Sequence, residues 1–186
     1  MSTENNLDKT FNSSVKILSD LIAFKSISGE DNNSIINYCE KIFNDLGAES
    51  FKIYDSDKKR VNLFASLKSK NKNGKKPIIL SGHTDVVPVS KGWSSDPFIA
   101  TIKNEKLYGR GSCDMKGFLA CLLAYAPIFS NSNMDRDLHF SFTFDEETAC
   151  QGAPLLIKEL KKRNIKDAIC VVAVSYTHLR AHETKK

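Results

Sequence analysis

The chain has 186 residues, of which 41% are hydrophobic and 26% are charged, and its formal net charge is +5 at pH 7. These values predict one ordinary globular domain, and no continuous apolar run approaches the roughly 18 residues of a membrane span, so we expect no membrane partner. Much of the positive charge lies in a polar loop at 68–76 that has no interleaved aromatic residues. We therefore expect no nucleic-acid partner.

The N-terminal stretch gives no sign of export. Met1–Val15 is polar, carries Glu4 and Asp8, and lacks the apolar core of a secretory signal. Five cysteines are scattered without a paired spacing, and an odd number does not suit a disulfide framework. We expect a cytoplasmic protein with reduced thiols.

The first half of the chain predicts two helices and then three strands. Apolar residues recur at helical spacing over 13–24 and over 35–46, and Gly47 is placed to end the second helix. Short apolar or alternating runs predict strands at 50–54, 61–67 and 77–80. The polar loop between the last two strands predicts that they form a hairpin.

The second half mixes strands and helices. It predicts a small hairpin from 97–102 and 106–108, a buried helix over 115–129, a strand over 138–144, a helix over 152–162 and a buried strand over 168–174. Alternating elements with several buried runs predict an α/β fold in three layers, with helices on both faces of a sheet.

The stretch Ser81–Pro88 places a histidine and an aspartate where a buried strand should end. His83 and Asp85 are two residues apart, so their side chains leave an extended backbone on the same face. Open α/β proteins place their ligand sites at such strand ends. This stretch is therefore the first candidate for a functional site.

Carboxylates recur at two later junctions between predicted elements, as Asp114 and as the pair Glu146 and Glu147. One histidine with several carboxylates suits Zn²⁺ or a similar ion, whereas an all-oxygen set would suit Mg²⁺ or Ca²⁺ better. The set suggests a site for two ions, in which a carboxylate bridges the ions and an unligated glutamate takes a proton from water.

Four blocks of the chain match one known pattern in order and spacing. The blocks are Ser81–Pro88, Gly92-Trp93 with Asp96–Phe98, Leu107–Phe118 and Asp145–Glu147. They resemble the co-catalytic zinc peptidase and deacylase family, known as M20, and the resemblance spans about residues 11–173. It implies a three-layer α/β/α catalytic domain of the zinc-peptidase type.

The resemblance also implies a role for each candidate residue. His83 would bind one metal ion, Asp114 would bridge two, and Glu147 would bind the second. Asp85 would orient His83 by accepting its other ring N–H, and Glu146 would be the general base. The implied cofactor is Zn²⁺, two ions in a complete site, with Co²⁺ as a possible substitute. A hydroxide held between the ions would attack an amide carbonyl.

The resemblance narrows the substrate to small N-acylated amino acids. The blocks Cys113–Phe118 and around Trp93 look most similar to family members that remove acetate from N-acetylornithine in arginine biosynthesis. Succinyl-diaminopimelate desuccinylases and dipeptidases of the same family remain the alternatives.

The family pattern breaks near the end of the chain. After 170–173 the family continues with an acidic metal-binding loop, a lid or dimerisation domain that forms homodimers, and a distal histidine, none of which is found here. We therefore expect 1–173 to be the N-terminal part of an incomplete catalytic domain and 174–186 to be a tail foreign to the family. This polypeptide by itself would then be inactive, and a non-catalytic fragment is a second hypothesis.

Two other hydrolase mechanisms are weaker alternatives. Ser81, His83 and Asp85 are the residue types of a catalytic triad, but they lie on one face of one strand. Cys113 is a better nucleophile candidate for a thiol hydrolase. Loss of activity on chelation, restored by Zn²⁺ or Co²⁺, would separate metal chemistry from thiol chemistry.

Overall fold

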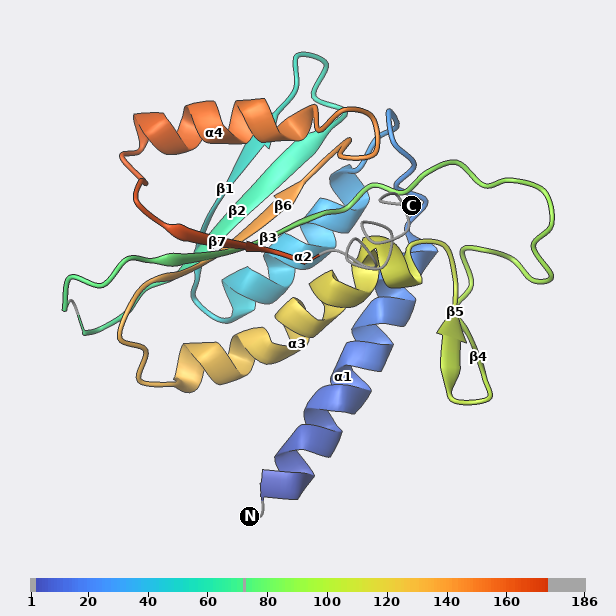
Figure 1. Ribbon diagram of the computed structural model, residues 1–186, viewed down its shortest axis with the longest axis horizontal. Coiled ribbons are helices and arrows are strands. Elements are labelled where there is room, and N and C mark those ends of the chain that lie inside the picture. Colours follow the sequence, from blue (N-terminus) through green and yellow to red (C-terminus); the bar gives the residue numbers. More distant parts are fainter. Residues whose placement is uncertain (1–2, 72, 174–186) are drawn as a thin grey trace, which may run out of the picture.

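The computed structural model describes residues 3–71 and 73–173 of the chain, so the predicted tail 174–186 lies outside the described residues. In chain order the elements are α1 (Thr3–Ala23), α2 (Asn33–Asp45), β1 (Glu49–Tyr54), β2 (Val61–Leu67), β3 (Ile78–His83), β4 (Thr101–Lys103), β5 (Lys106–Tyr108), an irregular helical turn (Ser112–Lys116), α3 (Gly117–Asn131), β6 (Leu138–Thr143), α4 (Gly152–Lys162) and β7 (Ile169–Val172). Five strands form a mixed sheet in the order β1-β2-β6-β3-β7, and β4 and β5 form a separate hairpin (Figure 1).

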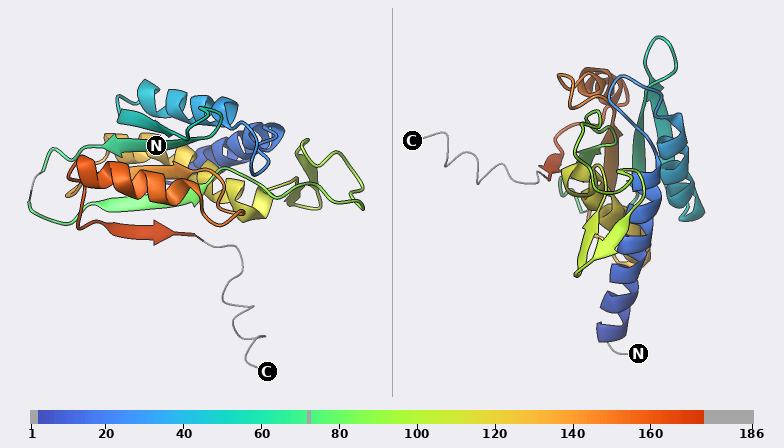
Figure 2. Two further views of the ribbon diagram at one scale, coloured as in Figure 1. Left: turned by 90° about the horizontal axis from the view of Figure 1, so that it is seen from above. Right: turned by 90° about the vertical axis from the view of Figure 1, so that its right-hand side faces the viewer.

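Helices cover both faces of the sheet, which confirms the three-layer α/β architecture (Figure 2). α1, α2 and α3 pack together on one face, and α4 packs on the other. In the main core, Phe43 of α2 lies against Phe140 and Phe142 of β6, with ring centroids 4.7 and 5.8 Å apart. On the opposite face, Arg163 after α4 lies over the ring of Phe51 of β1. Because both faces are covered, every residue of β2 and β6 is buried.

The predicted hairpin between β2 and β3 is wrong, because β6 lies between these strands. β2 pairs with β6 in the antiparallel direction, and β3 pairs with β6 in parallel. The apolar residues of β6 are buried at the centre of the sheet, where strands and helices surround them. The polar loop between β2 and β3 only has to cross one intervening strand, a span of about 10 Å or two strand spacings.

The ends of β3 and β6 lie side by side. The two strands are parallel, and their register pairs His83 with Thr143, so the segments that follow leave from the same edge. The chain crosses from β3 to β6 through α3 on one face and from β6 to β7 through α4 on the other. Where crossovers take opposite faces, an open α/β sheet leaves a crevice beyond its carboxyl ends that commonly binds ligands.

Several predicted elements are confirmed. The helices predicted at 35–46 and 152–162 match α2 and α4, and the helix predicted at 115–129 matches α3 apart from its irregular first turn. The β4-β5 hairpin is also present, although its first strand is shorter than predicted. Its turn residues Asn104 and Glu105 have φ of 50° and 58°, which suits a two-residue hairpin turn.

Two predictions near the ends of the chain are wrong. α1 begins at Thr3 and not at residue 13. Its first half projects from the body and exposes Leu7 and Phe11, so burial does not impose an apolar period at these two positions (Figure 1). β7 was predicted to be buried, but Ile169 and Val172 are 48% and 58% exposed. Within the described residues β7 pairs only with β3, and α4 packs against β1, β2 and β6 instead.

One apolar stretch of the described chain, Ser112–Asn131, has the length and composition to cross a membrane, with a mean hydropathy of 1.2. Asp114 and Lys116 interrupt it, so the sequence shows no continuous apolar run there. The stretch is 44% buried and packs against α1, as the core helix of a soluble protein also would, so it is a weak indication of a span.

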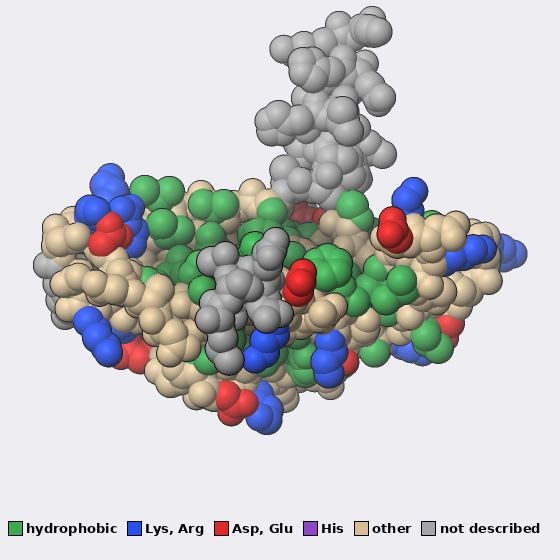
Figure 3. Space-filling view, turned by 90° about the horizontal axis from the view of Figure 1, so that it is seen from below, with side chains coloured by type: hydrophobic (Ala, Val, Ile, Leu, Met, Phe, Trp, Pro, Cys, Tyr) green, Lys and Arg blue, Asp and Glu red, His purple; other side chains and the backbone are tan. Residues whose placement is uncertain are grey.

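Hydrophobic side chains gather across the middle of the face of the molecule shown in Figure 3.

Candidate metal centre

His83 ends β3 with its side chain only 5% exposed. Its Nδ1 lies 3.0 Å from the backbone oxygen of Asp85 and 3.4 Å from Asp85 Oδ1. Nε2 faces Asp114 Oδ1 at 3.3 Å and Glu146 Oε2 at 3.7 Å. Burial opposes protonation of the ring, but the hydrogen bond to Asp85 and the charges of Asp85 and Glu146 outweigh it and raise the pKa of His83 to about 9. The surroundings of this ring therefore favour positive charge.

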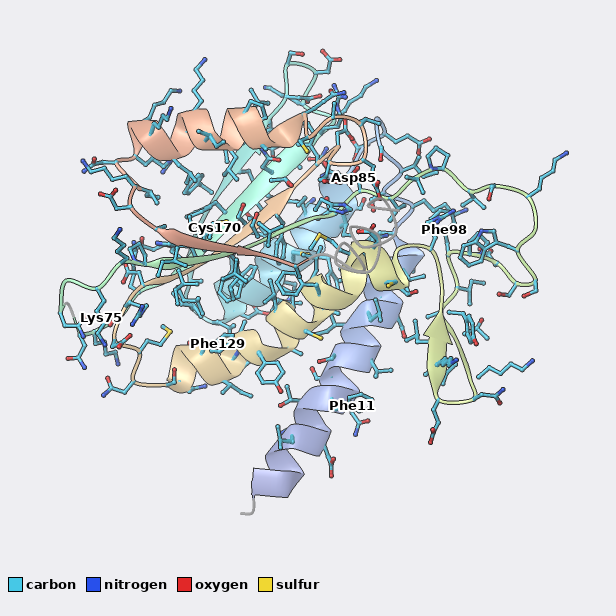
Figure 4. The ribbon with its side chains drawn as sticks, viewed as in Figure 1. Phe11, Lys75, Asp85, Phe98, Phe129 and Cys170 are labelled. Carbon is cyan, nitrogen blue, oxygen red and sulfur yellow. The ribbon has the colours of Figure 1, made fainter. Side chains whose placement is uncertain are left out.

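Asp85 joins the end of β3 to the segment after β6. Its Oδ1 accepts the backbone N–H of Glu146 at 3.0 Å, and its Oδ2 accepts the N–H of Glu147 at 3.2 Å and the hydroxyl of Ser28 at 2.7 Å. Burial raises the pKa of Asp85, but hydrogen bonds from His83, Ser28 and Glu146 outweigh it, so the pKa lies below its usual value. The ionised carboxylate thus organises both halves of the site at this end of the sheet (Figure 4).

Asp145 fixes the bend that presents the two glutamates. Its φ of 52° lies in the left-handed region, which aspartate tolerates better than most residues. The buried carboxylate accepts the N–H of Gly29 at 2.7 Å and forms an ion pair with Arg60 at 2.8 Å. These contacts give Asp145 a structural role, because they hold the bend from two other loops.

Asp114 reaches the site from the irregular turn Ser112–Lys116. Its φ of −125° and ψ of 99° interrupt the helical conformation, so the side chain leaves the turn toward His83. The next residue, Met115, is buried, and its sulfur lies 3.3 Å from the backbone nitrogen of His83. Packing of Met115 therefore sets the turn directly against the end of β3.

The structure brings all five predicted site residues together from three segments. Ligand atoms of His83, Glu146 and Glu147 lie within 4.8 Å of one another, and Asp114 adjoins His83. Burial, followed by the charge of Asp114, raises the pKa of Glu147. One imidazole nitrogen among carboxylates fits Zn²⁺ by donor type. A divalent ion would also relieve the repulsion between the negative charges of the neighbouring carboxylates.

A cavity of about 680 Å³ opens beside these residues. His83, Asp114 and Glu146 line its polar part, and α4 and β7 supply apolar side chains such as Leu156 and Val172. A cavity with a few convergent polar groups and an apolar wall is typical of a small-molecule site. Glu146 is exposed to this space, so a bound molecule could reach its carboxylate.

The weaker hydrolase alternatives gain no geometric support. Ser81 Oγ donates to Ser141 Oγ at 3.4 Å. A triad would require this hydroxyl to bond to the His83 ring, and the described residues show no such bond. Cys113 is exposed and precedes Asp114, but no histidine contact activates its thiol among the described residues.

Three residues that support the site were not predicted. Ser28 bonds to Asp85, Arg60 holds Asp145, and Lys116 is fully buried behind the Asp114 turn. Ser28 and Arg60 lie in loops with no motif, and only the tertiary structure brings them here. A lysine inside an apolar helical pattern was the one visible signal for Lys116.

A family comparison agrees with this geometry. The sequence profile described as peptidase family M20/M25/M40 matches residues 79–182, more than half of the chain. The chain belongs to this family. Its relatives in the M20 family are enzymes that act on amide bonds, and the family generally uses divalent metal ions such as zinc.

Curated M20 relatives include acetylornithine deacetylases of three bacteria. The protein of Yersinia pestis is 39% identical over 143 residues, which cover 72% of this chain and 36% of the relative. That of Aliivibrio fischeri strain MJ11 is 33% identical over 172 residues, 88% of this chain and 43% of the relative. That of Klebsiella pneumoniae is 35% identical over 178 residues, which cover 91% of this chain and 45% of the relative. The chain thus spans less than half the length of these relatives.

Solved structures of M20 enzymes share the fold. Human carnosine dipeptidase 1 superposes with a TM-score of 0.73 at 21% identity, covering 91% of this chain and 40% of that protein. The metallo-carboxypeptidase Sso-CP2 of Sulfolobus solfataricus gives a TM-score of 0.69 at 25% identity, covering 86% and 36%. The catalytic-domain type predicted from the four sequence blocks is therefore confirmed.

Proposed function

We propose that this chain carries part of the active site of a metal-dependent amidohydrolase that removes the acyl group from an N-acylated amino acid. The observation that carries the proposal is the convergence of His83, Glu146 and Glu147 within 4.8 Å, with Asp114 beside them. Asp85 holds the first of these side chains and the backbone of the next two.

In this proposal His83, Asp114 and Glu147 would hold Zn²⁺, with Co²⁺ as a possible substitute. Bound zinc would polarise an amide carbonyl and lower the pKa of water. Asp85 orients the His83 ring, because an N–H held at Nδ1 leaves Nε2 free to bind a cation. Asp114 would occupy the bridging position, since it adjoins His83 yet remains half-exposed toward the cavity.

Glu146 is proposed as the general base. Its backbone is fixed by Asp85, whereas its side chain is 46% exposed and lines the cavity. A base needs such access, because it must take a proton from water and return it to the leaving amine.

The proposed reaction of the whole protein is the conversion of N-acetylornithine to ornithine and acetate in the cytoplasm, as a step of arginine biosynthesis. The names of the bacterial relatives support this choice. Succinyl-diaminopimelate desuccinylase and dipeptidase activities remain alternatives, and a dipeptidase is among the structural relatives. In this view 1–173 is the N-terminal part of the catalytic domain.

Co²⁺ titration of the chain, followed by visible absorption, tests these roles. We expect fewer than two equivalents to bind, since the described residues offer one histidine at the site. Glu147→Gln should weaken binding by about 10-fold or more, whereas Glu146→Gln should bind like the wild type. The reverse result would exchange the two roles, and no binding by the wild type would overturn the metal centre. We also expect negligible hydrolysis of N-acetylornithine by this chain, and robust turnover would contradict that expectation.

A further inference from the structure

Lys116 is the one lysine among the described residues that is fully buried. Its Nζ donates to the backbone oxygen of Phe24, the residue that follows α1, at 2.8 Å. The ammonium thus meets the C-terminal end of a helix, where the peptide dipoles favour a cation. Its further electrostatic neighbours are the buried thiol of Cys39 and, with a smaller effect, Asp85, the carboxylate that organises the site.

The carbon chain of Lys116 is packed as tightly as its charged end. A Cβ placed on Gly111 would lie 3.2 Å from Lys116 Cδ and 2.6 Å from Val86 Cγ1. The backbone N–H of Lys116 also donates to the oxygen of Gly111 at 2.9 Å and closes the turn. Gly111 has a φ of +79°, so the lack of a side chain there serves both the conformation and the close approach.

Asp114 precedes two anchored residues but is itself weakly held. Met115 fixes the turn to β3, and Lys116 fixes it to the end of α1. Among the described residues, the Asp114 carboxylate has one polar contact, with His83 Nε2, and is 42% exposed. Its position therefore depends on the anchors on its C-terminal side more than on its own contacts.

Stability alone does not explain a charge at this position. Removing an ammonium group from water is costly, and an apolar side chain of similar volume often replaces a buried charge without loss of stability. A methionine could fill the same channel between Gly111 and Val86. The charge instead supplies a donor at the end of α1 and a cation behind a cluster of carboxylates.

We propose that Lys116 is a positioning residue of the metal centre. It ties the turn Ser112–Lys116 to the end of α1 and thereby holds Asp114 opposite His83. This inference rests on the metal centre proposed above, and it adds a residue that touches neither the metal ion nor the substrate.

Co²⁺ is the probe, because its visible absorption reports ligand number and geometry as well as affinity. Two variants test the anchor: Lys116→Met removes the charge and keeps the volume, and Gly111→Ala crowds Val86 and the lysine chain without removing charge. The control is Lys52→Met, which removes a partly buried lysine whose ion pair with Glu40 lies away from the site. Thermal unfolding in EDTA is measured for each protein.

Both anchor variants should bind Co²⁺ about 10- to 100-fold more weakly than the wild type, with an altered visible spectrum. Lys52→Met should keep the wild-type affinity and spectrum even where its melting temperature falls. If the anchor variants lose thermal stability but retain wild-type affinity and spectrum, Lys116 is merely structural and the inference is overturned. If the wild type binds no Co²⁺, the metal centre itself fails, and this inference fails with it.

Discussion

Replacement of Asp85 by asparagine should destabilise the fold even without metal. The carboxylate is buried and accepts N–H groups from Glu146 and Glu147 and a hydroxyl from Ser28. Asparagine retains one acceptor oxygen, and its NH₂ group would face a donor. At least one charge-assisted hydrogen bond is then lost, worth about 1.5–3 kcal/mol, and the remaining ones weaken. We expect the free energy of unfolding to fall by about 3 kcal/mol, or about 6–12 °C in melting temperature for a chain of this size.

The assay is urea and thermal unfolding of the wild type and Asp85→Asn in EDTA, so that metal affinity does not contribute. The matched control is Asp45→Asn, an exposed carboxylate that pairs with Lys41 one helical turn away. Its effect should stay below about 0.5 kcal/mol. A loss below about 1 kcal/mol for Asp85→Asn would show that this carboxylate does not hold the two loops together.

Three further predictions concern pH, metal and the core. Burial lowers the pKa of His139 to about 4 from 6.5, so the unfolded chain takes up this proton first. The contribution of neutral His139 to the free energy of unfolding is complete above pH 6.5. It falls by about 3 kcal/mol as the pH drops through 4. Urea titrations should show this slope in the wild type and not in His139→Gln; equal slopes would refute it. Zn²⁺ at about 100 times its dissociation constant should raise the free energy of unfolding by about 2.7 kcal/mol. Calorimetry should show that EDTA reverses this gain and that His83→Ala lacks it. Phe43→Ala should cost about 3–5 kcal/mol in urea unfolding, and a loss near zero would contradict its packing against β6.

Local patterns predicted most of the elements but not how the strands pair. Apolar period and turn residues placed α2, α4 and the strand before the glutamate pair within a residue or two. The predicted hairpin between β2 and β3 was wrong because strand pairing depends on the whole fold. β6 lies between the two strands in the sheet, but it is farther along the chain than any local signal reaches. β7 failed for a related reason, since an apolar run predicts a strand but not whether another element covers it.

The candidate site shows the same division. The sequence by itself determined which side chains could bind metal, because His83, Asp85, Asp114 and the glutamate pair are recognisable by residue type and spacing. Only the tertiary structure decided that they meet, since the parallel register of β3 and β6 sets two strand ends side by side.

The contacts of Ser28 and Arg60 could not be read from the chain, and the only sign of Lys116 was a lysine within an apolar helical pattern. Ser28, Arg60 and Lys116 come from segments that lack a shared motif, and each acts on the site through a partner distant in sequence. The kind of ligand atom that a side chain offers is a property of the single residue, so it can be read from the sequence. Distances between donors depend on sheet register and helix packing, which the whole fold sets.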